Sequence, residues 1–142
     1  INVGVPNKEE IIMVKIKLSN GTEYEVLPVT AVYPSYSSNS RSRMEIHMPL
    51  DAMTDAEFIA LFSDKDLTKK ISIINTETDS NITYEGYNEP FSIGVSRYDT
   101  TVVATGEPVE EYHLVANLEQ LTYQEADVRR MKEILEQMSK QA

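Results

Sequence analysis

The sequence predicts an α+β protein: mainly an antiparallel β-sheet, folded as a small sandwich or open barrel, with one short inserted helix and a C-terminal amphipathic helix. Alternation of apolar and polar residues dominates residues 13–118, as in half-buried strands. Two Thr-x-x-Glu capping boxes, at Thr54 and Thr122, mark helix starts. No long helix separates the strands, which favours antiparallel pairing. We therefore expect a β-rich domain over 13–118 with a helix near 54–62, and a separate helical segment over 119–142.

The amino-acid composition limits the classes of function that the chain can have. The 142-residue chain is 41% apolar and 25% charged, which is ordinary for one globular domain with a real core. A formal net charge of −10 and a pI of about 4.6 predict no binding to nucleic acids or to anionic membranes. The absence of cysteine excludes disulfides, zinc–thiolate sites and cysteine nucleophiles, and it fits a cytoplasmic protein.

Residues 1–12 are expected to be a translated leader or a disordered extension. Lys8, Glu9 and Glu10 can be encoded by a purine-rich run that contains a bacterial ribosome-binding sequence upstream of a start codon at Met13. Ile12 favours the alternative of a genuine extension, because it continues the alternation of the first strand.

The first strands are predicted to form a hairpin over residues 13–27. A two-residue Asn-Gly loop would place glutamates on the apolar face. A three-residue loop at Ser19–Gly21 instead pairs Ile16 with Tyr24, and it needs Gly21 in the left-handed region. We expect the three-residue loop, because it matches the faces of the two strands.

A strand at 29–33 and a strand ending at Pro49 flank a polar loop. Residues 34–42 of this loop lack periodicity, so it is either mobile or a contact surface. In the second strand one face is apolar and the opposite face is polar; the apolar residues are Met44, Ile46 and Met48, and the polar ones are Arg43, Glu45 and His47.

The short helix begins at its capping box, Thr54 to Glu57, with Met53 and Phe58 at the hydrophobic-staple positions. Its expected buried stripe is Phe58, Leu61 and Phe62. Further strands are predicted at 70–75, 82–87, 91–98, 101–104 and 111–118, with turns at 77–81, 88–90, around Asp99 and at 106–108.

The C-terminal helix carries the candidate interface. Thr122 and Glu125 form its capping box, and large apolar residues recur in steps of three and four. These residues are Val128, Met131, Ile134, Leu135 and Met138. Ile134 makes the stripe broader than a two-stranded coiled-coil seam. The helix therefore either packs on its own domain or joins copies of the chain in an oligomer, and both alternatives stay open.

The sequence indicates no catalytic, cofactor or metal site. No nucleophile elbow, phosphate-binding loop or EF-hand spacing occurs, and we expect a protein that is not an enzyme. His47 and His113 stand opposite the apolar faces of their strands and are expected to be solvated. Five tyrosines, expected at strand ends or in loops, either close the rims of the core or serve protein or sugar contacts: Tyr33, Tyr36, Tyr84, Tyr87 and Tyr98.

The chain resembles small proteins encoded in the tail or baseplate region of phages and prophages of Gram-positive gut bacteria. The resemblance lies in the order and spacing of the segments VKIKLSNGTEYEV, MEIHMPLDAMTDAEFIALFSD, ISIIN…YEGYNEPFSIGV and VANLEQLTYQEADVRRMKEILEQM. It implies a non-enzymatic structural or tail-assembly role through protein contacts, in the cytoplasm of a bacterial host or in the virion. Two other functions stay open, an acidic inhibitor or immunity-type binding protein and a carbohydrate-binding module.

Overall fold

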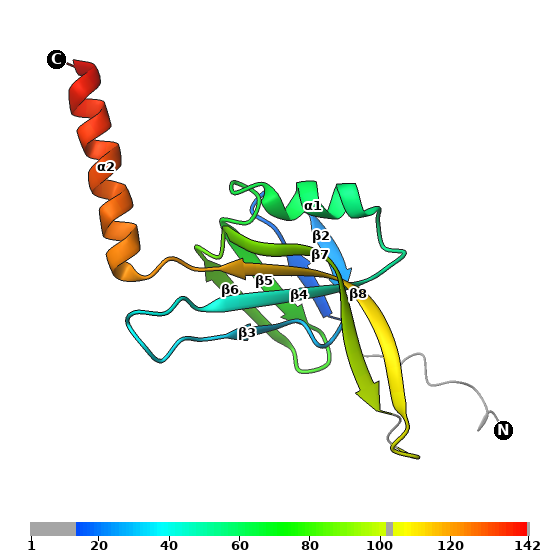
Figure 1. Ribbon diagram of the computed structural model, residues 1–142. Coiled ribbons are helices and arrows are strands. Elements are labelled where there is room, and N and C mark those ends of the chain that lie inside the picture. The colour runs from blue at the N-terminus through cyan, green and yellow to red at the C-terminus, as the bar shows by residue number, and fades with distance from the viewer. Residues whose placement is uncertain (1–13, 102–103, 142) are drawn as a thin grey trace.

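The computed structural model describes residues 14–101 and 104–141, and it is an α+β protein with two four-stranded antiparallel sheets. The predicted fold class is confirmed, and neither sheet closes into a barrel within the described ranges (Figure 1). The elements are β1 (Val14–Lys17), β2 (Glu23–Val26), β3 (Ala31–Tyr33), β4 (Arg43–Pro49), α1 (Asp55–Ser63), β5 (Lys70–Asn75), β6 (Ser80–Glu85), β7 (Glu89–Thr101), β8 (Pro108–Glu119) and α2 (Tyr123–Gln141).

The two sheets have the strand orders β2-β1-β5-β6 and β3-β4-β8-β7, and both contribute to one hydrophobic core. The apolar faces expected from the alternation of β1 and β4 are buried, with Ile16, Met44 and Ile46 fully shielded from solvent. Residues 1–12, expected to be a leader or an extension, lie outside the described residues.

The first hairpin has the predicted register. Val14 pairs with Val26 and Ile16 with Tyr24, so the apolar residues of both strands share a face. Gly21 has a φ of 85°, the left-handed conformation that the three-residue loop requires.

β7 corrects two predictions. The turn expected around Asp99 is absent, because a single 13-residue strand runs through that position and pairs with β8. The turn expected at 88–90 is displaced to residues 86–88, because β7 already begins at Glu89, with an irregularity in register between Pro90 and Ser92. β7 is an edge strand, where a proline removes no hydrogen bond from the interior of the sheet. Of the strand predicted at 101–104, residues 102–103 lie outside the described ranges.

α1 begins where its capping box predicts. The Glu57 backbone N–H donates to Thr54 Oγ1 at 3.1 Å, and the Thr54 hydroxyl donates to the Glu57 carboxylate at 3.1 Å. Phe58 and Phe62 are completely buried, with ring centroids 4.9 Å apart, and the helix packs against β7 and β8.

α2 projects away from the two sheets, and only its first turns lie beside them (Figure 1). It follows the end of β8 directly, after a connection of three residues. Neither helix in the described part of the chain combines the length and apolar character needed to cross a lipid bilayer.

Candidate interaction surface

The start of α2 is fixed by a reciprocal capping box. The Glu125 backbone N–H donates to Thr122 Oγ1 at 3.2 Å, and the Thr122 backbone N–H donates to Glu125 Oε1 at 3.2 Å. Two of the N–H groups that a helix leaves unpaired at its start are thus satisfied locally. The sequence prediction for this helix start is confirmed.

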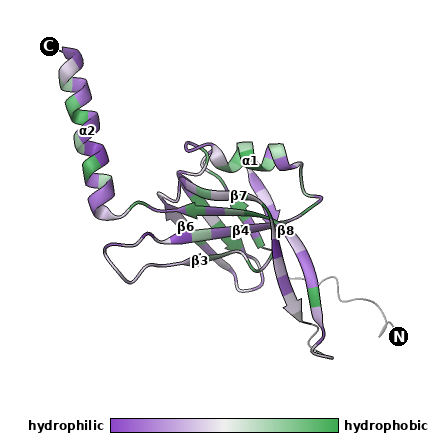
Figure 2. Cartoon of the chain, in the orientation of Figure 1, coloured by the Kyte–Doolittle hydropathy of each residue, from purple (hydrophilic) through white to green (hydrophobic). Residues whose placement is uncertain are grey.

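The apolar residues of α2 form what we call the helix stripe, namely Val128, Met131, Ile134, Leu135 and Met138. Each is between 49% and 63% exposed, and no residue of α2 is buried. Figure 2 shows apolar residues along α2, and no other element lies over the later turns of the helix. Of the two alternatives for this helix, packing on its own domain is therefore wrong in this structure.

Arg41 holds the base of α2 on the body. Its Nε donates to Glu125 Oε1 at 2.9 Å, a second guanidinium nitrogen contacts the same carboxylate, and Nη1 lies 3.1 Å from Glu119 Oε1 at the end of β8. The hydrogen bonds from Arg41, with the backbone N–H of Thr122, lower the pKa of Glu125 to about 2. The pairing also raises the pKa of Arg41, chiefly through Glu125.

A second ion-pair group lies beside the first. The Arg129 guanidinium binds Glu89 at the start of β7, and Lys65 Nζ lies 3.4 Å from the same carboxylate. Burial acts to raise the pKa of Glu89, but the hydrogen bond from Arg129 and the charge of Lys65 outweigh it and lower the pKa. We call Arg41, Glu89, Glu119, Glu125 and Arg129 the base clamp. It fixes the direction of α2 at its first two turns.

The base clamp is expected to open in acid. The pKa of Glu125 falls from an ordinary 4.5 to about 2 on folding, so its contribution is fully present above pH 4.5 and is lost as the pH falls toward 2. NMR titration of the Glu125 carboxyl should give the depressed pKa, and Arg41→Gln should return it toward 4.5. A Glu125 pKa unaffected by Arg41→Gln would contradict the clamp.

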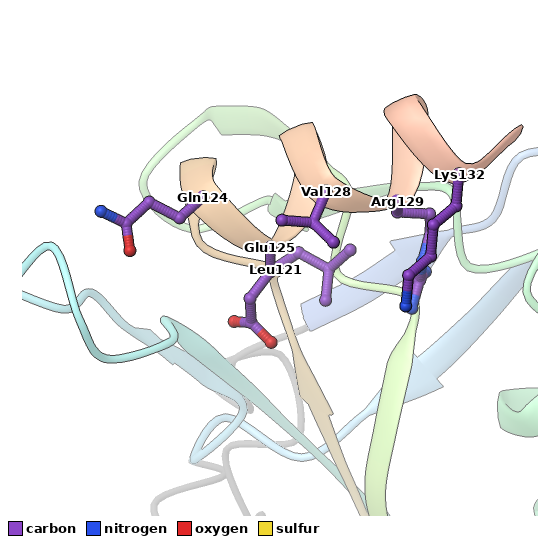
Figure 3. Close-up of a pocket in the computed structure, with 6 residues that line it drawn as sticks. All are labelled: Leu121, Gln124, Glu125, Val128, Arg129 and Lys132. Carbon is purple, nitrogen blue, oxygen red and sulfur yellow. The ribbon is translucent and has the colours of Figure 1, made fainter. Parts of the chain in front are cut away.

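Two hollows flank the base of α2. The larger, of about 580 Å³, lies between the serine-rich loop at 34–42, the segment around Gly86 and the start of the helix. Tyr36 and Tyr123 line it and are 97% and 92% exposed. The smaller, of about 370 Å³, is bordered by six side chains from the connection before α2 and from its first three turns (Figure 3), which are Leu121, Gln124, Glu125, Val128, Arg129 and Lys132. The helix stripe thus begins at the edge of this smaller hollow, with Val128.

His47 and His113 are buried, whereas the sequence predicts solvated side chains. They were expected to be solvated, but they are only 2% and 6% exposed, and their Nδ1 atoms lie 3.0 Å apart. Each Nε2 faces a carboxylate two residues earlier on its own strand, Glu45 at 3.0 Å and Glu111 at 3.1 Å. Residues two apart share a strand face, and β4 pairs with β8, so the two histidine–glutamate pairs meet end to end.

This network serves packing and hydrogen bonding. The Tyr98 ring stacks on His113 with centroids 5.1 Å apart and meets His47 edge-on. Burial lowers the pKa of His47, against the opposing effect of its hydrogen bond to Glu45. Among the described residues, no group of three or more His, Asp or Glu side chains is arranged to hold a metal ion.

The five tyrosines do not gather into one site. Tyr84 and Tyr87 contact each other edge-to-face, with Tyr87 in the core. Tyr98 belongs to the histidine network, the Arg43 guanidinium lies over the Tyr33 ring, and Tyr36 lines the larger hollow. No shared tyrosine-lined cleft therefore forms from these five side chains.

The structure brings together the residues predicted on α2 and adds partners that the sequence did not reveal. Arg41 and Glu125 are 84 residues apart, and no local pattern links them. The sequence feature that could indicate this contact is the single arginine of the serine-rich loop, together with the glutamate in the first turn of α2. Comparison of the chain with protein-family models, with curated proteins and with solved structures found no match.

Proposed function

We propose that this chain is a non-enzymatic structural or tail-assembly accessory protein of a phage or prophage, and that it acts through protein contacts made by α2. The helix stripe carries the proposal, because five large apolar side chains remain half exposed on one element. A contiguous apolar surface of this kind marks an interaction site, since covering it gains about 25 cal/mol per Å².

The base clamp supports a contact role. Without it, the amphipathic helix could turn its apolar side onto the sheets. Arg41 and Arg129 instead attach the first two turns to β8 and β7 through carboxylates, so the stripe stays available to a partner. The body then serves as a stable support and α2 as the contact element.

The assignment to phage particles rests on the resemblance in the order and spacing of the segments. In this role the chain acts in the cytoplasm of the bacterial host, where tails assemble, and it can remain in the virion.

Incorporation of the chain into particles tests this proposal. Particles induced from a bacterium that carries the gene should contain the wild-type chain when examined by mass spectrometry. Leu135→Glu, which places a charge in the helix stripe, should reduce its amount at least several-fold. The matched control is Gln137→Glu, which adds the same charge about 160° around the same helix from Leu135 and should leave incorporation unchanged. Absence of the wild-type chain from the particles, with unchanged particle yield after deletion of the gene, would overturn the proposal.

A further inference from the structure

We propose that the partner covering the helix stripe is a second copy of this chain, packed parallel and in register along α2. This inference rests on the proposed contact role of α2 and names the partner for it. Its first support is the spacing of the stripe. Val128 and Leu135 are one heptad apart, as are Met131 and Met138, which gives the two columns of a coiled-coil seam, with Ile134 beside them.

Charge determines the direction of packing. In a parallel pair, the residue just before a seam position on one helix faces the residue five positions further along the other helix. Asp127 of one copy therefore faces Lys132 of the other. An antiparallel pair that aligns all four apolar layers would instead set Lys132 against Lys132, Asp127 against Gln141 and Ile134 against Ile134. Charge therefore favours parallel packing, which gains two attractive contacts, whereas the antiparallel pair gains one apolar contact and acquires a like-charge contact.

Asp127 is available for such a contact. Its carboxylate pairs with Arg130 at 3.0 Å within the helix, and both side chains remain about two-thirds exposed, at 65% and 67%. A carboxylate has acceptor sites for a second cation. The lysine of a second copy can therefore bind without displacing Arg130.

The position of the body leaves room for this packing. Successive residues of a helix are about 100° apart around its axis. Measured from Val128, Glu125 and Arg129 lie about 60° and 100° around the axis in one direction. Leu135 and Met131 lie about 20° and 60° in the other direction. The sheets are attached through Glu125 and Arg129, so they stand to the outside of a bundle formed on the stripe. The projection of α2 from the body keeps its later turns clear of the sheets (Figure 1).

Sedimentation equilibrium of the full chain tests self-association. Wild type should show a mass of two or more times 16.1 kDa. Leu135→Glu should return the mass to one chain, and Gln137→Glu should retain the wild-type mass. A wild type of 16.1 kDa at its highest soluble concentration would overturn the inference. If that monomer still entered particles only when Leu135 was intact, the partner would be a different protein and the proposed function would stand.

Cross-linking tests the parallel register. The natural chain has no cysteine, so one introduced cysteine reports alone. Parallel packing brings the two copies of residue 138 together, whereas the antiparallel alignment separates them by about ten residues, or about 15 Å. Met138→Cys should therefore form a disulfide-linked dimer much faster than Gln137→Cys under the same oxidant. Equal rates for the two variants would overturn the parallel arrangement.

Charge exchange tests the same register without covalent chemistry. Asp127→Lys should weaken association about two- to five-fold, the scale of an exposed ion pair. Adding Lys132→Asp to that variant should restore it, because the exchanged charges again face each other. Asp127→Lys also removes the ion pair with Arg130, so helix content must be compared as a control. Far-UV circular dichroism should show the same helix content in the variants as in the wild type. Failure of the second substitution to restore association would contradict the proposed contact.

Discussion

Replacing Phe58 by alanine is expected to lower the free energy of unfolding by about 3–5 kcal/mol, the usual cost of truncating a buried phenylalanine. Phe58 is 0% exposed and contacts Phe62 across 4.9 Å between ring centroids. The substitution would leave a cavity where α1 meets β7 and β8. Urea denaturation of the two proteins measures the difference.

The adjacent residue supplies a matched control. Ile59 lies on the same helix and is 43% exposed, so Ile59→Ala should change stability by less than about 1 kcal/mol. Comparable losses for Phe58→Ala and Ile59→Ala would contradict the packing of α1 described above. The effect also concerns function, because β8, which α1 covers, leads directly into α2.

Local chemistry explains why several features could be predicted from the sequence. The register of the first hairpin depends on Gly21 and on matching the faces of two adjacent strands, all within one short segment. The starts of α1 and α2 depend on a threonine and a glutamate three residues apart. Such short-range requirements leave few alternatives.

The strand predicted at 91–98 lies within β7, but the full length of β7 could not be predicted, because pairing with a distant partner overrides the local sequence at Asp99. Asp99 suggests a turn in isolation, but cross-strand pairing with Glu110 on β8 keeps the backbone extended. Arg97 then binds both Asp99 and Glu110, at 2.7 and 2.8 Å, so a cation offsets the two facing carboxylates. Sequence alternation records neither the partner strand nor the neutralising charge.

The direction of α2 was equally beyond local reasoning. Its apolar stripe is compatible with packing on the sheets or with assembly, and the local sequence does not distinguish the two. Arg41, from a loop without periodicity, makes that attachment with Glu125 and Glu119. The sequence could therefore identify the residues of the stripe but not their exposure.

Replacing His47 by leucine is expected to lower the free energy of unfolding by about 2–3 kcal/mol. The change removes the partner of His113 Nδ1 at 3.0 Å and one partner of Glu45, and a buried polar group left unpaired costs about 1–3 kcal/mol. Burial of the network arises because Glu45 and His47 on β4 meet His113 and Glu111 on β8. Each strand pattern alone predicts a solvated histidine, because the buried hydrogen-bonded group forms only when the two strands pair.

A double-mutant cycle measures whether the two rings act as one unit. His47→Leu and His113→Leu should each be costly, but the double variant should lose at least 1 kcal/mol less than the sum of the two, about the strength of one buried hydrogen bond. The second substitution removes the very group that the first leaves unpaired. Urea denaturation of the four proteins at pH 7 gives the three differences. Strictly additive losses would mean that the 3.0 Å contact between the rings contributes nothing to stability, and that the burial of each histidine has a separate cause.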